Sequence, residues 1–236
     1  MSIITKIKNP ELAISYYRNH RELVSDALMR PRPLSLIAMN VEKLMNVRKN
    51  PSFLSNHNSV IYYPDGQPIT WFSKEEYPRL PGVEVWIELH KAAIHQKLNV
   101  LFIGAQKKVI EKTEQKLLEL KLSDNVKFVD GYQSSAVYYR VIQSFRPDVV
   151  FVAMGSPKQE QFISQLTTRH KNAIYMGIGG SLDVFSGHKT RSPYFLRRLG
   201  LEFLYRLYVE PKRILRQYVY VYFVILFVLG EFRVKQ

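Results

Sequence analysis

Cysteine is absent from this chain of 236 residues, and so are other features that would indicate a particular class of protein. Without cysteine the chain has no disulfide framework, no thiolate nucleophile and no cysteine-bound metal. The longest apolar run, 218–230, is shorter than the roughly 18–20 residues that a membrane-spanning helix needs. The first ten residues contain no apolar stretch typical of a secretory signal. We therefore expect a protein that lies on a membrane, if it meets one, rather than crossing it.

Common signatures of nucleotide and metal binding are missing as well. No G-x-G-x-x-G opens the first strand–helix unit, and the glycine-rich segment 177–187 lacks the Lys-Ser/Thr pair of a P-loop. This absence disfavours a nicotinamide-dependent oxidoreductase. No Asp-x-Asp pair is present to hold a divalent metal. The histidines show no metal-ligand spacing either; they are His20, His57, His90, His95, His170 and His188.

Positive charge is in excess, because 34 lysines and arginines face 20 acidic residues and the formal net charge is +14. Such a charge attracts nucleic acid, acidic lipid or phosphorylated substrates. A nucleic-acid-binding protein would explain it, but the chain lacks an RNP motif, zinc-finger spacing and a basic zipper. Basic residues gather after about Phe195, beside the aromatic and aliphatic segment 218–229, which favours an anionic membrane surface over nucleic acid. The alternative is an ordinary C-terminal helix packed on its domain.

Six short runs of β-branched and aromatic residues recur along the chain, and helix-like stretches separate them. This alternation predicts an α/β fold, with a Rossmann-like parallel sheet covered by helices on both faces. We assign it to residues 1–195 and assign residues 196–236 to a basic and aromatic helical appendage. The predicted strands are Leu34–Met39, Val60–Tyr63, Val100–Ile103, Val126–Val129, Val149–Met154 and Ala173–Met176.

Glycine, asparagine or aspartate stands at the end of each predicted strand. Glycine and aspartate end strands in many proteins, so any one of these positions is ambiguous. In a parallel sheet, however, ligands bind outside the carboxyl ends of the strands, and a following helix N-terminus favours a phosphate. Six such ends in succession predict a nucleotide-type cleft; they carry Asn40, Asp65, Gly104, Gly131, Gly155 and Gly179.

The strongest local motif is the segment 153–160, in which a strand meets a glycine and a helix begins at Ser156-Pro157. Proline suits the first helical position, and Ser156 with Gln159 matches a capping box. That interpretation is entirely structural. The functional alternative brings Lys158 and Gln159 close to a ligand at the carboxyl end of the strand.

Two further segments carry candidate chemistry. Gly177–Gly187, followed by Arg191-Ser-Pro193, predicts a tight turn that lets the backbone pack close to a ligand. Asp65, in Tyr63-Pro-Asp-Gly66, stands at the end of a predicted strand, where a carboxylate can act as a general base. Taken alone, Asp-Gly is more often a simple turn.

Taken together, the motifs resemble the WecG/TagA/CpsF glycosyltransferases (glycosyltransferase family 26), over about Leu34 to Gln217. The segments 38–45 and 184–188 are most similar to the enterobacterial WecG type. The motifs fall in the order Asp65-Gly66, Arg79–Gly82 with Glu84 and Trp86, Phe102–Gly104, Asp130–Tyr132, Met154–Glu160, Gly177–Gly187, Arg191–Pro193 and Gly200–Arg206.

The resemblance implies transfer of a sugar with inversion at its anomeric carbon, with Asp65 as the general base. The basic C-terminal positions of the family match Arg206, Arg213 and Arg216 in this chain, and we assign these arginines to the leaving diphosphate. Arginine can bind a diphosphate in place of a metal ion. We therefore predict activity without a metal or other cofactor. Together with the strand-end argument, the resemblance assigns substrate binding to Asn40, Gly66, Arg79, Glu84, Gly104, Asp130, Gly131, Tyr132, Gly155, Lys158, Gln159, Glu160, Gly179, Gly180, Asp183 and Arg191.

The implied partners are a UDP-sugar donor, a polyprenyl-diphosphate-linked acceptor and the anionic inner face of the cytoplasmic membrane, with self-association and without nucleic acid. The WecG type transfers N-acetylmannosaminuronic acid to undecaprenyl-diphosphate-linked N-acetylglucosamine, and the TagA type transfers N-acetylmannosamine. A transferase of another UDP-hexose, such as UDP-glucose, is the alternative. Two departures bear on the sugar: Ala38 replaces a threonine of the TagA type, and Glu84 replaces an aspartate.

Overall fold

The computed structural model describes residues 3–8, 11–50, 54, 59–73, 76–190, 214–232 and 234–235. Within these residues, one sheet contains nine strands in the order β6-β5-β7-β8-β3-β4-β2-β1-β9. The strands are β1 (Ile3–Lys8), β2 (Glu11–Tyr16), β3 (Leu34–Met39), β4 (Val60–Pro64), β5 (Val100–Gly104), β6 (Val126–Val129), β7 (Val149–Ala153), β8 (Ile174–Gly177) and β9 (Val234–Lys235).

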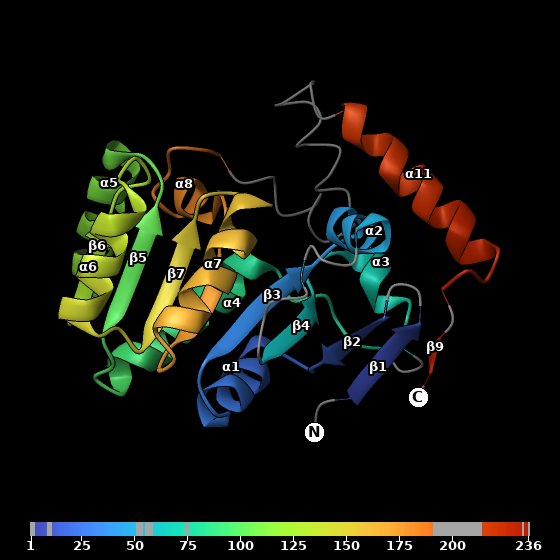
Figure 1. Cartoon of the computed structure of the whole chain (residues 1–236), viewed down its shortest axis with the longest axis horizontal. Coiled ribbons are helices and arrows are strands. Elements are labelled where there is room, and N and C mark those ends of the chain that lie inside the picture. The colour runs from blue at the N-terminus through green and yellow to red at the C-terminus, as the bar shows by residue number, and fades with distance from the viewer. Residues whose placement is uncertain are drawn as a thin grey trace.

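Seven neighbouring strands, from β6 to β2, are parallel, which confirms the predicted Rossmann-like sheet. All six predicted strands form, with bounds that differ by one residue at most. The predicted set did not include β1, β2 or β9. Strand β1 pairs antiparallel with β2 and with β9, so the two ends of the chain meet at one edge of the sheet (Figure 1).

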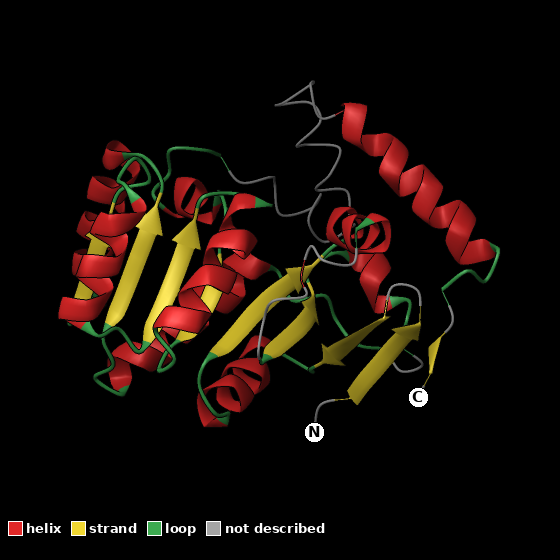
Figure 2. Cartoon of the chain, viewed as in Figure 1, coloured by secondary structure: helices red, strands yellow, loops and turns green. Residues whose placement is uncertain are grey.

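Helices cover both faces of the sheet, as Figure 2 shows, because alternate residues of each buried strand point to opposite sides. In β5, Val100 and Phe102 face one core, and Leu101 and Ile103 face the other. The first face is covered by α1 (His20–Met29), α4 (Gly82–His95), α5 (Lys107–Glu119) and α8 (Ser181–Phe185). The second is covered by α2 (Val41–Lys49), α3 (Gln67–Thr70), α6 (Ser135–Phe145), α7 (Lys158–Arg169) and α11 (Ile214–Val228).

Helix α11 packs against α2 and places one side in the core of the α/β fold (Figure 1). Phe223 and Leu226 are buried there with Phe72 of the segment after α3, and Phe232 joins the same cluster. The described part of the C-terminal segment therefore packs as part of the folded domain. Among the described helices, none has the length and apolar character required to cross a bilayer.

The opposite side of α11 is apolar and exposed. Val228 is 78% exposed, and six other large apolar side chains of this stretch are also exposed: Tyr218, Val221, Tyr222, Val224, Ile225 and Leu229. Isolated apolar residues are normal on protein surfaces, but a continuous apolar helix face indicates an interaction surface.

Candidate active site

The predicted strand-end residues lie along a single edge of the sheet. Because β6, β5, β7, β8, β3 and β4 are consecutive and parallel, their carboxyl ends form one continuous row (Figure 1). The helices that follow β5 and β6 pack on opposite faces, so the order of the strands in the sheet reverses between β5 and β7. In parallel α/β sheets a ligand crevice usually lies at such a reversal. The row reads Gly131, Gly104, Gly155, Gly179, Asn40 and Asp65.

Asp65 is held in place by backbone hydrogen bonds from two directions. Its own N–H donates to Met39 O at 2.9 Å, which fixes the turn after β4 to the end of β3. One carboxylate oxygen, Oδ1, accepts from the backbone N–H of Gly82 at 2.8 Å, at the start of α4. The Asp-Gly turn at this position therefore also serves to orient a half-buried carboxylate.

Asn40 lies beside this turn and begins α2. Its side-chain Oδ1 accepts from the backbone N–H of Lys43 at 2.9 Å, so Asn40 is the N-cap of the helix. A Cβ on Gly66 would lie 3.5 Å from the Asn40 Cβ, which shows how closely the ends of β3 and β4 approach. Asn40, Asp65 and Gly66 thus form one cluster, as the sequence predicted.

The predicted capping box at Ser156 and Gln159 is wrong. Pro157 is the N-cap of α7 rather than its first helical residue, and no side chain caps the helix. The buried Gln159 side chain instead accepts from Gly179 N at 2.9 Å and donates to Glu160 Oε1 at 3.0 Å. Gln159 therefore links α7 to the glycine-rich turn after β8, because a partner in tertiary structure competes successfully with the local cap.

Glu160 forms a buried ion pair that the sequence did not reveal. Its Oε1 lies 2.8 Å from Lys43 Nζ, and the two side chains are only 2% and 10% exposed. Burial raises the pKa of the Glu160 carboxyl, but the Lys43 ammonium and the hydrogen bonds outweigh this effect and lower the pKa below its usual value. The pair connects the start of α2, next to Asn40, with the start of α7.

The other half of the row is built from backbone. Gly104 has a φ of +115°, and a Cβ there would collide with the carbonyl of Ala153. Ala105 N donates to Ala153 O at 3.0 Å, and Gly131 N donates to Ala105 O at 2.9 Å. The ends of β5, β6 and β7 are therefore drawn together without side chains between them.

Three side chains stand out at this end of the row. Asp130 accepts from the Gln133 amide at 2.7 Å and from Tyr132 N at 3.0 Å, and these hydrogen bonds lower its pKa. Tyr132 is 76% exposed, so its ring is available at the edge of the sheet. Lys158 is also exposed, at the first position of α7.

The other predicted site residues that the structure describes lie in turns or near the starts of helices. Gly155 and Gly179 have φ values of +77° and +50°, Gly180 is the N-cap of α8, and Asp183 lies in the first turn of that helix. Arg79 precedes α4, and Glu84 is in its first turn, with Glu84 Oε2 3.3 Å from His20 Nε2 of α1. Arg191, Arg206 and Arg213 lie outside the described residues, and Arg216 belongs to the first turn of α11.

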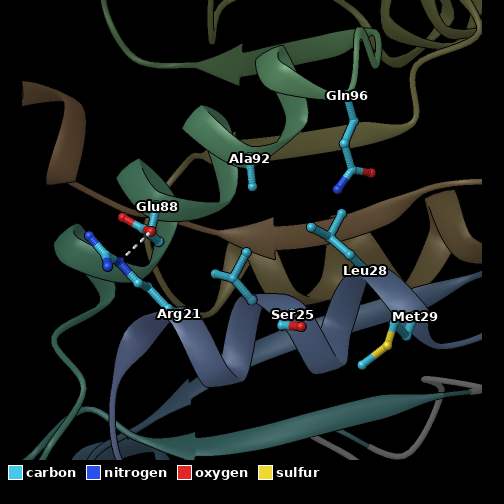
Figure 3. A pocket seen from close by; sticks show the side chains of 8 residues that line it. Arg21, Ser25, Leu28, Met29, Glu88, Ala92 and Gln96 are labelled. Carbon is cyan, nitrogen blue, oxygen red and sulfur yellow. Dashed lines mark ion pairs between the residues drawn. The ribbon is translucent and has the colours of Figure 1, made fainter.

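A cavity of about 310 Å³ lies elsewhere, between α1 and α4 (Figure 3). An Arg21–Glu88 ion pair closes one end, and Val24, Leu28 and Ala92 supply apolar walls. None of the predicted site residues lines it. In the part of the chain that the structure describes, no three histidine or acidic residues gather in a metal-binding cluster.

The model of the family described as "Glycosyl transferase WecG/TagA/CpsF family" matches residues 12–236, which is nearly the whole chain. The match includes the complete row of strand ends and the C-terminal segment.

Proposed function

The chain belongs to the WecG/TagA/CpsF family of glycosyltransferases, and we propose that it is an inverting hexosyltransferase of surface polysaccharide biosynthesis. The proposed donor is UDP-N-acetylmannosaminuronic acid or UDP-N-acetylmannosamine. The proposed acceptor is N-acetylglucosamine linked to undecaprenyl diphosphate. The observation that carries the proposal is a half-buried carboxylate, Asp65, oriented by a backbone N–H at the carboxyl edge of a parallel sheet.

In the proposed reaction, an acceptor hydroxyl oxygen attacks the anomeric carbon of the donor sugar. Asp65 takes the hydroxyl proton as the new carbon–oxygen bond forms, and the bond between the sugar and UDP breaks. UDP leaves with the bonding electron pair, and the configuration at the carbon is inverted. The Gly82 N–H bond supports this role, because a base must be held at a fixed angle to the proton that it removes.

The backbone-lined half of the row is the proposed site of the nucleotide. Close approach of peptide groups at Gly104 and Gly131 suits a phosphate or ribose, and exposed Tyr132 offers an aromatic face on which a base can stack. Asp183, at the start of α8, is proposed to contact the nucleoside. Lys158 and Gln159 are proposed to contact the donor from the start of α7.

We assign the leaving diphosphate to Arg206, Arg213 and Arg216. Helix α11 begins on the side toward which β3, β5 and β7 point, and then descends toward β9 (Figure 1). The first turn of this helix therefore lies on the side of the molecule that carries the strand ends. We expect full activity in EDTA; loss of turnover that Mg²⁺ or Mn²⁺ restores would contradict the assignment.

The exposed apolar face of α11 is the proposed contact with the inner face of the cytoplasmic membrane. Basic residues before it and tyrosines within it match the composition of membrane-interface segments. Replacing Val221, Ile225 and Val228 by serine should abolish flotation with anionic liposomes. The matched control replaces the exposed Leu118 and Leu120, near the end of α5, and should float like the parent. Retention on single-stranded nucleic acid but not on liposomes would contradict the proposal.

The decisive test of the reaction is a UDP-release assay over a panel of UDP-sugars, with a short-chain polyprenyl-diphosphate-N-acetylglucosamine acceptor. We expect acceptor-dependent release from one of the two N-acetylmannosamine-type donors. Release from UDP-glucose instead would keep the reaction and change the donor. Absence of release from every donor, with an enzyme that binds UDP, would contradict the proposed function.

A further inference from the structure

The buried residue Gln159 connects the turns that follow β7 and β8. Its backbone N–H donates to Gly155 O at 2.9 Å, and its side-chain Oε1 accepts from Gly179 N at 2.9 Å. The amide also lies against Gly177, where an added Cβ would be only 2.5 Å from Gln159 Nε2. Among the residues that the structure describes, no other side chain forms a hydrogen bond with the glycine-rich turn 178–180. Gln159 is therefore the side chain that holds this turn.

The Gln159 amide can hold the turn in one orientation only. Its two ends differ, because Oε1 accepts hydrogen bonds and Nε2 donates them. An amide turned by about 180° would present Nε2 to the Gly179 N–H, so that two donors would face each other. A buried donor without an acceptor is costly, and the turn would have to move. The orientation of the amide is therefore as important as its presence.

Glu160 and Lys43 determine this orientation. Gln159 Nε2 donates to Glu160 Oε1 at 3.0 Å, and Lys43 Nζ lies 2.8 Å from the same oxygen. Burial opposes ionisation of Glu160, but Lys43 and the hydrogen bonds keep the pKa of its carboxyl below the usual value. The ionised carboxylate has only acceptor atoms, so Nε2 must face Glu160 and Oε1 is left for Gly179.

We propose that Lys43 is a positioning residue for the donor site: its ion pair with Glu160 fixes the amide of Gln159. The oriented amide then holds the turn 178–180 in place. This turn leads directly into α8, whose first turn carries the proposed nucleoside contact Asp183. The inference rests on the proposed function, because that proposal assigns the donor to this edge of the sheet.

Two variants separate this role from simple stabilisation of the fold. In Glu160→Gln, the side-chain oxygen can still face both Lys43 and Gln159, because the two donors share Oε1. The Gly179 bond should therefore persist, although the buried lysine loses its counter-ion and stability falls. In Lys43→Met/Glu160→Gln no charge is stranded, but no ion fixes the orientation of either amide. The double variant should be the more stable of the two and yet lose the Gly179 bond.

The experiment measures exchange of the Gly179 amide proton by NMR and the affinity for UDP by calorimetry, in the full chain. In Lys43→Met/Glu160→Gln, exchange should be about tenfold faster and UDP binding about five- to tenfold weaker, since one hydrogen bond is lost. Glu160→Gln should stay within about twofold of the parent in both measurements, because it keeps that bond. Gln159→Leu removes the amide and gives the values for complete loss of the bond.

The matched control is Arg48→Met/Glu231→Gln. It removes an ion pair at the opposite end of α2, where Arg48 Nη2 lies 3.2 Å from Glu231 Oε2, and should change neither measurement. The inference would be overturned if Lys43→Met/Glu160→Gln matched the parent, or if Glu160→Gln were the more affected of the two variants. A parent that binds no UDP would instead contradict the proposed function, and exchange at Gly179 would still test the role of Lys43.

Discussion

The two halves of the strand-end row are built in different ways. At β5, β6 and β7 the closest contacts are between backbone atoms, and glycine is required at position 104 because a side chain would collide with Ala153. At β8, β3 and β4 side chains carry the contacts: Gln159, Glu160 and Lys43 form one buried network, and Asp65 is tied to Gly82.

This contrast indicates that the two halves of the row have different roles. Backbone donors and exposed aromatic surface suit a nucleotide, whose binding needs close approach and little chemistry. A fixed carboxylate suits the transfer step, in which a proton must move at a defined place. Substitutions in the two halves should therefore affect different quantities.

The largest expected effect is at the base. Asp65→Asn keeps the hydrogen-bond acceptor toward Gly82 but removes the charge, and should lower acceptor-dependent turnover by about 10²–10⁴-fold. UDP affinity should change little, because the nucleotide is assigned to the other half of the row. A folded Asp65→Asn protein with normal turnover would rule out Asp65 as the base.

The next effect concerns the buried ion pair. Lys43→Met leaves the Glu160 charge buried without its partner and should cost about 3–5 kcal/mol of unfolding free energy in a urea titration. The double variant Lys43→Met/Glu160→Gln has no stranded charge and should recover most of that loss. Equal stability of the single and double variants would show that the pair is not coupled.

Acid should weaken the core beneath the backbone-lined half. Burial is the main cause that lowers the pKa of His90 from 6.5 to about 4, among Trp86, Phe102 and Phe151. The unfolded chain therefore binds a proton between these pH values and the folded chain does not, so stability is complete above pH 6.5 and falls toward pH 4. The loss should reach at most about 3 kcal/mol. His90→Gln should be insensitive to pH at this site; an identical pH dependence in both proteins would contradict the explanation.

The smallest effect compares two glycines with positive φ. Gly104→Ala should lose about 1–3 kcal/mol, because backbone strain is added to a collision with Ala153. Gly155→Ala meets no atom within 4 Å and should show the conformational cost alone, roughly 1 kcal/mol. Thermal or urea unfolding of the two variants measures the difference, and a greater loss in Gly155→Ala would be the contrary result.

Much of the parallel sheet could be predicted from the sequence, because its buried strands are continuous apolar runs that end in glycine or a polar residue. The clustering of Asn40, Asp65 and Gly66 followed from that topology. Strands β1, β2 and β9 could not be predicted in this way, since β1 and β2 mix apolar with polar residues instead of forming continuous apolar runs, and β9 has only two residues. Pairing of β1 with β9 also joins the two ends of the chain, a contact that local pattern does not encode.

The side-chain network was beyond sequence reasoning for a different physical reason. Ser156 and Gln159 have the spacing of a capping box, but the turn after β8 offers Gln159 a buried partner at Gly179. Lys43 looks like a surface lysine on α2, and only the folded structure brings Glu160 to it. The contact of Gly82 with Asp65 joins residues 17 positions apart.

Hydrogen exchange of backbone amides, measured with and without UDP, tests the assignment of the nucleotide most directly. We predict that UDP slows exchange in the segments after β5, β6 and β7, around residues 104–107, 131–135 and 155–159, and leaves the α1–α4 cavity unchanged. Slower exchange confined to residues 21–29 and 88–96, with no change at the strand ends, would contradict it.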